Sequence, residues 1–463
     1  MDIQKLALNG ANIVLTKCLS LEEDDKLAIF WDEETEETAS VFIKAAQELK
    51  ISVRERKVSI EEQSQFSRGQ DLSFEDSDAL NTSRGIITCL SNHSRGTSYR
   101  LKLIEEGTSK GIRFGHMPGA NLKLLAHAAV KIDYNEASRR CDDLALALTV
   151  GEKIKLQTYI FSPDGSRQAF DLEFDLGGIN RPAITSSGVI SPGTWGNIPG
   201  GETFIAPKED TAEGIYVLNG AFTSYIFEPS TYLLLHFSKG NLEKIEGNPE
   251  AKKKLETIFN SRLADDEHYN SLAELGIGVN KEIIELTGNA LFDEKCAGTA
   301  HIAVGDNRRY GGVHHSSIHE DMISRSPSLW IDGKQILSNG ENVFNPKDWR
   351  ETLKSRSADT LTLNNEDLIS RTEVPVGKSD KGELQVHRQV TAGRVCVYTV
   401  GDLKTSQALF QIYSVIPVIP QEINAMELIE QVKSKYKMSV EDINSAVAIL
   451  EFHKLISIHK KSN

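Results

Sequence analysis

Histidines and carboxylates are concentrated in one stretch of the chain. Four of the twelve histidines fall between residues 301 and 319, within GTAHIAVGDNRRYGGVHHSSIHED. Asp306, Glu320 and Asp321 lie in the same stretch, beside a glycine pair at 311 and 312. Imidazole nitrogens and carboxylate oxygens are the donors that divalent metal ions bind in proteins. The stretch therefore predicts a metal site.

Two predicted strands carry these donors. The apolar run 300–304, which contains His301, predicts a short buried strand. If 319–321 is also a strand, His319 and Asp321 share one face and Glu320 points the other way, towards solvent. A lone buried histidine is more often an ordinary core residue, but a neighbouring His-x-Asp strand favours a metal ligand.

Three glutamates stand in unusual surroundings. Glu202 follows a Pro-Gly-Gly turn and opens an apolar strand, and Glu274 lies in the apolar, glycine-rich string AELGIG. A carboxylate buried there without a cation or several donors is costly. Glu294 directly precedes the strand that carries His301. The alternative for Glu202 and Glu274 is an ordinary surface glutamate, and the alternative for Glu294 is a charged turn.

The order of these strings resembles a known family. NIPGGE followed by AP, AELGIG, DEK with GTAHIAVG, and a closing His-x-Asp are similar to the aminopeptidase T and aminopeptidase S family of metallopeptidases, over residues 5–335. The resemblance implies two divalent ions, zinc, cobalt or manganese. It also implies the metal ligands Glu202, Glu274, Glu294, His301, His319 and Asp321.

One departure points to a sister branch. The family's catalytic tyrosine stands seven positions after the first ligand histidine, where this chain has Arg308, and Tyr310 comes two residues later. The string DNRRYGG is closer to a branch that resembles 2,5-dihydroxypyridine dioxygenase, an iron enzyme on a similar fold. In that alternative, His301, His319 and Asp321 would hold a single Fe(II).

The leading hypothesis is a metallo-aminopeptidase. A metal-activated water would cleave the N-terminal residue of a peptide, with Glu202 or Glu274 relaying the proton and Tyr310 or Arg308 stabilising the oxyanion. The dioxygenase is the second hypothesis. The third is a peptide-binding protein on a peptidase fold that has lost its activity. Metal content separates the first two, because two ions favour hydrolysis and one iron favours oxygenation.

The pattern along the chain predicts an α/β protein with three parts. Residues 1–150 alternate strands and helices as in a layered α/β domain, and residues 151–345 form a strand-rich α+β metal-binding domain. Residues 346–463 form an extension, with strands expected at 390–400 and 409–419 and helices at 426–436 and 440–453. The helix pair predicts a helix-turn-helix or winged-helix-like module, which could dock a peptide.

Composition restricts the partners. A net charge of −14 and a pI near 5.4 argue against nucleic acid, and no apolar run reaches the length of a membrane-spanning helix. The five cysteines form no CxxC pair, so we expect reduced thiols and a cytoplasmic protein. No nucleotide-binding fingerprint is present. The expected substrate is a peptide or small molecule, and the family resemblance implies a homodimer.

Overall fold

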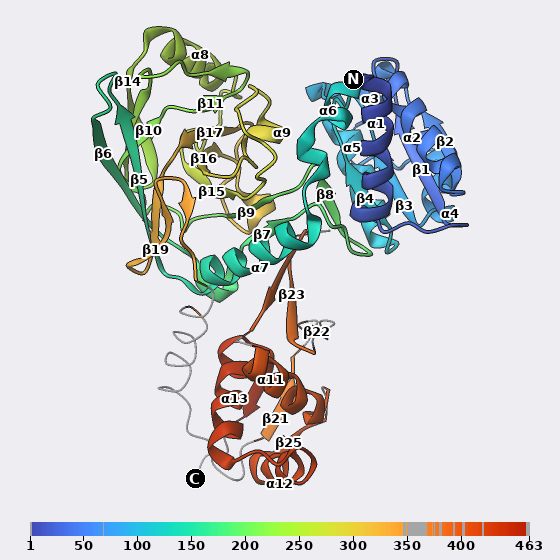
Figure 1. Cartoon of the computed structure of the whole chain (residues 1–463), viewed down its shortest axis with the longest axis vertical. Helices are drawn as coiled ribbons and strands as arrows, with labels where there is room; N and C mark the ends of the chain where they lie inside the picture. The colour runs from blue at the N-terminus through green and yellow to red at the C-terminus, as the bar shows by residue number, and fades with distance from the viewer. Residues whose placement is uncertain are drawn as a thin grey trace.

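The computed structural model describes residues 2–67, 69–345, 349, 368–372, 374, 376–378, 382–391, 394–400, 403–418 and 421–459. Figure 1 shows a helix-covered sheet at the N-terminus, a large two-sheet body, and a helical unit near the C-terminus. The mixed α/β fold expected from the sequence is confirmed. Among the described residues, no helix is long and apolar enough to cross a membrane.

The N-terminal part is a parallel sheet covered by helices on both faces. The strand order is β2-β1-β3-β4-β8. On β1, Leu27 and Ile29 pack into the core with α1 and α2, whereas Ala28 and Phe30 pack into the core with α4 and α5. Both faces are buried, as is usual for parallel sheets. The elements are β1 (Lys26–Trp31), β2 (Ser52–Lys57), β3 (Gly85–Thr88), β4 (Arg113–His116), β8 (Trp195–Asn197), α1 (Ile3–Ile13), α2 (Glu36–Glu48), α3 (Ile60–Gln65), α4 (Phe74–Thr82), α5 (Thr97–Ser109) and α6 (Leu122–Ala126).

The large body consists of two antiparallel sheets that share a core. The outer sheet has the order β14-β13-β10-β6-β5-β18-β19-β20, and the inner sheet has the order β12-β11-β17-β16-β15-β9-β7. Tyr216 on β10 donates its hydroxyl to the carbonyl oxygens of Ala300 and Met322, which ties the two sheets together. The outer strands are β5 (Lys153–Phe161), β6 (Arg167–Asp175), β10 (Glu213–Leu218), β13 (Leu233–Ser238), β14 (Asn241–Gly247), β18 (Ser328–Ile331), β19 (Lys334–Ser338) and β20 (Glu341–Asn342).

The inner sheet supplies the candidate site. Its strands are β7 (Ile184–Ser186), β9 (Glu202–Ile205), β11 (Ala221–Phe222), β12 (Tyr225–Ile226), β15 (Leu272–Gly278), β16 (Thr299–Gly305) and β17 (His319–Arg325). Helix α8 (Pro249–Asn260) begins at the N-cap Asn248, and a short helix α9 (Ala290–Asp293) precedes β16. The strand predicted at 300–304 is confirmed as the centre of β16.

Two elements join the N-terminal part to the large body. Helix α7 (Tyr134–Val150) buries Cys141, Leu144 and Leu148 in the core of the large body, and it runs along the lower edge of that body in Figure 1. Strand β8 comes from the middle of the chain, yet it pairs with β4 of the N-terminal sheet. The first two parts of the chain therefore share a sheet.

The C-terminal part contains α11 (Leu403–Val415), α12 (Ala425–Tyr436) and α13 (Val440–Phe452). The predicted helix pair is confirmed, and the side chain of Ser439 caps α13. The strand expected at 409–419 is wrong, because most of that segment belongs to α11. Leu409, Ile412 and Ile416 are buried at helical spacing. The strands are β21 (Leu368–Arg371), β25 (Ile423–Asn424) and β26 (Ile456–His459) in one sheet, and β22 (Val376–Lys378), β23 (Leu384–Thr391) and β24 (Arg394–Thr399) in another.

The segment expected as a single strand at 390–400 is also different. Its first residues end β23 and its later residues form β24, so the chain reverses direction between them. Residues 392 and 393 lie outside the described residues. The long apolar run is therefore one arm of a hairpin and the end of the other.

Candidate metal centre

The register of the inner sheet brings the predicted ligands to one face. Ala303 on β16 lies opposite Glu274 on β15 and opposite Asp321 on β17. One row further along the sheet, Gly305 pairs with His319, and on the other side His301 pairs with Gly276. Residues directly opposite in antiparallel strands share a face. Small residues thus alternate with the ligands and leave space between them.

Four of the predicted ligands are linked by contacts in a chain, from His301 through Glu274 and His319 to Asp321. Glu274 lies 3.3 Å from Nε2 of His301 and 3.2 Å from Nε2 of His319, and Oδ1 of Asp321 lies 3.4 Å from the same atom of His319. One donor atom each from Glu274, His319 and Asp321 lies within 4.8 Å of the others. These distances suit a shared divalent ion, which would separate the donors slightly.

Contacts with the backbone position the two histidine rings. Nδ1 of His319 lies 2.9 Å from the carbonyl oxygen of Asp306, so this nitrogen donates and Nε2 faces the carboxylates. Such a bond fixes the ring orientation of metal-binding histidines. His301 is 1% exposed and lies flat over Gly276, where a Cβ would be 2.2 Å from Nε2. Its Nδ1 is buried without a hydrogen-bond partner among the described atoms.

Electrostatics hold the site in its charged form. Burial alone would raise the pKa of Glu274, but hydrogen bonds with His301 and His319 keep it below its ordinary value. Burial also opposes ionisation of Asp321, yet His319 lowers its pKa to about 2. Burial would lower the pKa of His301, but Glu274 and the nearby carboxylates raise it to about 9. The pocket therefore favours positive charge, as a cation site should.

Glu202 and Glu294 lie near these four side chains, but they contact the ammonium of a lysine. Oε1 of Glu202 lies 2.9 Å from Nζ of Lys295, and the same ammonium contacts Glu294. Lys295 is fully buried. The structure thus brings all six predicted ligands into one region. Three of them lie around a possible metal position, His301 lies beside Glu274 of that group, and the remaining two lie around a lysine. Lys295 was not among the predicted site residues.

The two residues predicted to stabilise an oxyanion lie on the short turn η5 (Arg308–Tyr310). The ring of Tyr310 is centred 5.1 Å from the ring of His319 and 5.3 Å from that of Phe204. Arg308 is more exposed, and its Nε donates to Asp306 at 2.9 Å. Of the two, Tyr310 is the one that packs against a ligand.

The prediction that Glu320 faces solvent is wrong. It points away from His319 and Asp321, as expected, but it is only 6% exposed and does not face solvent. Its carboxylate accepts a hydrogen bond from Thr223, and burial raises its pKa to about 7. The reason is that the opposite face of β17 is covered by the rest of the large body. The alternation of side chains along a strand predicts which residues share a face, but it does not predict which face is exposed to solvent.

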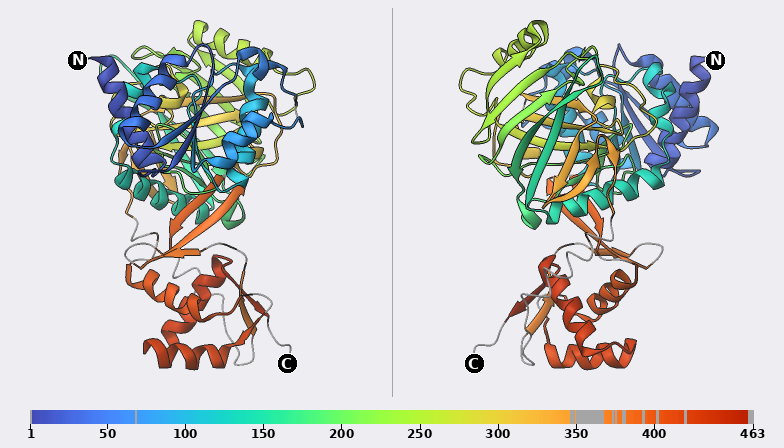
Figure 2. Two further views of the ribbon diagram at one scale, coloured as in Figure 1. Left: turned by 90° about the vertical axis from the view of Figure 1, so that its right-hand side faces the viewer. Right: turned by 60° about the vertical axis from the view of Figure 1, so that its left-hand side comes forward.

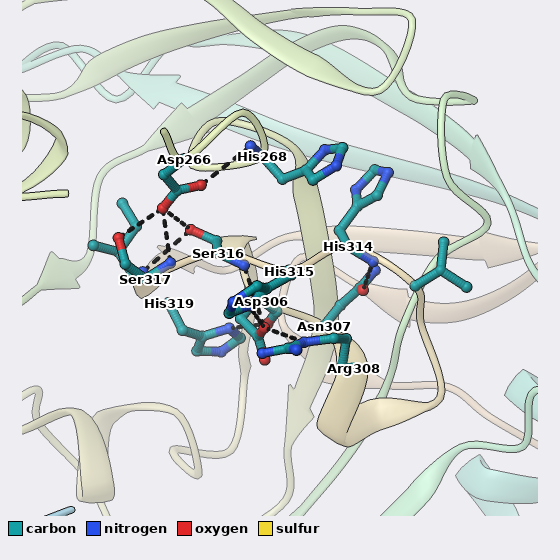
Figure 3. Close-up of polar contacts among 12 residues, drawn as sticks. Asp266, His268, Asp306, Asn307, Arg308, His314, His315, Ser316, Ser317 and His319 are labelled. Carbon is teal, nitrogen blue, oxygen red and sulfur yellow. Dashed lines mark hydrogen bonds and ion pairs between the residues drawn. The ribbon is translucent and has the colours of Figure 1, made fainter. Parts of the chain in front are cut away.

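The segment between the two ligand strands is braced by polar contacts (Figure 3). Asp266 accepts hydrogen bonds from the hydroxyls of Ser316 and Ser317, each at 2.7 Å. The rings of His268 and His314 stack with centroids 4.1 Å apart. Asp306 holds Arg308 through its side chain and His319 through its carbonyl. These contacts fix the approach to the metal position.

A pocket of about 660 Å³ leads to His319. One wall is the start of α5, with Thr97, Ser98 and Lys102, and the other is the 306–319 segment. This volume is in the range of small-molecule sites. Both the N-terminal part and the large body therefore contribute to the access route. The contribution of α5 to this pocket was not predicted, because nothing in the sequence of α5 marks the helix as facing a metal site.

Parts of the chain are similar to a dioxygenase and to an aminopeptidase. The family model for 2,5-dihydroxypyridine 5,6-dioxygenase matches residues 160–344. The curated 2,5-dihydroxypyridine 5,6-dioxygenase of Pseudomonas putida is 27% identical over 193 residues, which is 38% of this chain and 53% of the relative. The match thus spans about half the length of that relative.

Two solved structures share the fold. The 2,5-dihydroxypyridine dioxygenase of Pseudomonas putida KT2440 has a TM-score of 0.56 at 19% identity, over 74% of this chain and 99% of that one. Wild-type AmpT, an aminopeptidase T from Thermus thermophilus, has a TM-score of 0.52 at 14% identity, over 74% of this chain and all of that one. At these identities the likeness concerns the fold alone. Together the comparisons support an enzyme, and the structure contains a possible metal site.

Proposed function

We propose that this chain is a metal-dependent dioxygenase that opens a small hydroxylated aromatic ring. The observation that carries the proposal is the convergence of His301, His319 and Asp321 on one sheet face, in contact with Glu274. Two histidines and a carboxylate are the donor set of non-haem Fe(II) oxygenases. The matches to 2,5-dihydroxypyridine 5,6-dioxygenase support the same chemistry.

The residues present fit such an ion. His301 offers a buried ring nitrogen and His319 a partly buried one, and Asp321 and Glu274 supply negative charge that neutral imidazoles do not balance. Fe(II) held there would supply the one-electron chemistry that dioxygen needs to react with a closed-shell ring. Glu274, which contacts both imidazoles, would keep them in place.

The pocket supports a small planar substrate. Its volume of about 660 Å³ is sufficient for an aromatic ring with its substituents. Tyr310, beside His319, would pack on the ring and bind its oxygen substituents. Arg308 and Lys102 line the same pocket and would attract a deprotonated hydroxyl or carboxylate.

Peptide hydrolysis, the leading hypothesis from the sequence, is the second candidate. The fold likeness to AmpT favours it. Against it, two of the six carboxylate and histidine ligands expected for a pair of ions contact Lys295. Tyr310 also stands two residues beyond the position of the catalytic tyrosine. The predicted homodimer and the peptide-docking role of the C-terminal module stay predictions.

The test compares the two reactions on the same protein. Enzyme loaded with Fe(II) under nitrogen is mixed with dihydroxypyridines and dihydroxybenzenes, and oxygen uptake is recorded with an electrode. Zinc-, cobalt- and manganese-loaded protein is assayed against aminoacyl amides and short peptides. Oxygen uptake without amide cleavage supports the proposal. Amide cleavage without oxygen uptake would show that the peptidase hypothesis is the correct one.

Matched variants connect the activity to the site. His319→Ala and Asp321→Ala should each lower metal affinity by about 100-fold or more, because a donor is lost and the remaining carboxylates repel one another. The control is Glu320→Gln, which lies on the same strand but contacts Thr223 on the opposite face. It should keep metal and activity. Equal metal loss in all three variants would contradict the site.

A further inference from the structure

Lys295 is the unexpected member of this region. Its ammonium is fully buried, 2.9 Å from Glu202, and in contact with Glu294. A buried ammonium is costly unless carboxylates surround it, and removing one partner from such a cluster leaves an uncompensated charge. The lysine and the two glutamates therefore form one electrostatic unit.

The backbone fixes the lysine in this position. The amide of Asn280 donates to the carbonyl oxygen of Lys295 at 2.9 Å, and the Lys295 amide donates to Phe292 at 3.0 Å. Gly278 on β15 makes the close approach possible, because a Cβ there would lie 2.2 Å from the carbonyl oxygen of Cys296. The lysine is thus held from a turn that packs directly on the ligand sheet.

The carboxylates of the region form one charge system. Besides Glu202 and Glu294, it contains Glu274 and Asp321, and Glu294 interacts electrostatically with Glu202, Asp321 and Lys295. One divalent ion together with the ammonium supplies three positive charges against these four carboxylates. Two divalent ions together with the ammonium would supply five. Without the ammonium, two divalent ions would balance the four carboxylates. With the ammonium in place, a second divalent ion would bring more positive charge than the carboxylates carry, so the ammonium disfavours it.

We propose that the ammonium of Lys295 takes the place of a second metal ion and limits the centre to one ion per chain. Glu202 and Glu294 then serve as lysine partners, and Glu274, His301, His319 and Asp321 hold the metal. This inference rests on the proposed metal site. It goes further in assigning Lys295 as the residue that determines metal number.

The experiment counts ions in the full chain. Wild-type protein, Lys295→Met and Lys295→Arg are saturated with Mn(II), and bound metal is measured by elemental analysis and by calorimetric titration. The Mn(II) electron paramagnetic resonance spectrum separates an isolated ion from a coupled pair. We expect one ion in the wild type and in Lys295→Arg. We expect two coupled ions in Lys295→Met, because Glu202 and Glu294 then lack a cation.

A charge-balanced double variant guards against misfolding. Lys295→Met with Glu294→Gln removes one positive and one negative charge, so it should fold and bind one ion. Two ions in the wild type overturn the proposal, and so does a folded Lys295→Met variant that stays at one ion in excess Mn(II). A Lys295→Met variant that folds only with added Mn(II) supports it. Failure to fold even in Mn(II), beside a folded double variant, overturns it, since no ion then replaces the ammonium.

The outcome is independent of the oxygenase assay. Mn(II) counting needs no oxygen and no substrate. One ion in the wild type and two in Lys295→Met, without any oxygen uptake, would leave the role of Lys295 standing and remove the proposed reaction. Oxygen uptake by a wild-type enzyme with two ions would support the proposed reaction and overturn the role of Lys295.

Discussion

The position of the His301 imidazole depends on the absence of a side chain at Gly276. The two residues are paired across β15 and β16, and the ring lies over the glycine. A Cβ at Gly276 would stand 2.0 Å from Cε1 of the ring, far inside van der Waals contact. The glycine is therefore part of the candidate metal site although it offers no donor.

Gly276→Ala should displace the His301 ring. We expect metal affinity to fall by about 10- to 100-fold, as when groups that orient a ligand are lost. We also expect stability to fall by roughly 1–3 kcal/mol, because the site is overpacked. Calorimetric metal titration and thermal unfolding measure both effects. The control is Gly196→Ala on β8, where the nearest atom to the new Cβ is 3.7 Å away. Unchanged metal affinity in Gly276→Ala would contradict the role given to the ring position.

In the N-terminal sheet, a buried carboxylate joins the ends of neighbouring elements. Asp32 directly follows β1 and is fully buried. It accepts hydrogen bonds from the amide and the hydroxyl of Ser91, each at 2.6 Å, and from Gln63 of α3 at 3.0 Å. Burial by itself would raise the pKa of Asp32, but these bonds lower it below its ordinary value. The carboxylate therefore stabilises the wall that carries α5.

Asp32→Asn should destabilise the chain by about 2 kcal/mol, because an amide nitrogen can replace an acceptor and leave the Ser91 amide unpaired. The pKa of Asp32 is lower in the folded state, so its contribution is complete above about pH 4 and is lost as the pH falls below that value. Urea unfolding at pH 7 and pH 3 should show a large difference between wild type and variant at pH 7 and a smaller one at pH 3. Asp78→Asn, which removes only the exposed ion pair with Arg54, should have little effect. A difference that grows towards low pH would refute the assignment.

Local patterns were sufficient to predict many elements. The strand that carries His301 and the His-x-Asp strand were visible from apolar runs and from the spacing of two, which depends only on neighbouring residues. The pairing that brings Glu274 and Ala303 together was not visible, because it joins segments far apart in the chain. The helix α11 was misread because β-branched and aromatic residues obscured its helical spacing.

Two errors at the site have a common cause. Lys295 follows two acidic residues and reads as part of a charged turn, and Glu320 reads as the polar side of a strand. Both are buried in the structure. Charged residues are rarely buried unless paired, so composition favours exposure. Their partners come from distant segments, Glu202 from β9 and Thr223 from the turn between β11 and β12, and a single sequence gives no means of identifying them.

The three parts of the molecule meet around the access route. The pocket lies between α5 of the N-terminal part and the 306–319 segment of the large body. Strand β23 contacts the turn η5, which carries Tyr310, and β24 contacts α7 and β7. In Figures 1 and 2 the β23–β24 hairpin extends from the C-terminal helices up to the large body. The C-terminal part therefore supports the turn beside the metal site.

A chain ending at residue 345 should keep its metal but lose part of this support. Removal of β24 would expose the face of α7 that it contacts and lower the free energy of unfolding by about 2 kcal/mol. We therefore expect the melting temperature to fall by roughly 4–8 °C. Without β23, the turn η5 should become less ordered, so we expect weaker binding of ring substrates or their analogues at unchanged metal content.

Leu428→Ala, which opens a cavity at a buried position of α12 and leaves the hairpin in place, serves as the control and should keep ligand affinity. Thermal unfolding, elemental analysis and ligand titration measure the three quantities. Unchanged stability and ligand affinity in the shortened chain would show that the hairpin does not support the site. Peptide binding by a metal-free full-length chain, lost in the shortened one, would favour the binding-protein hypothesis.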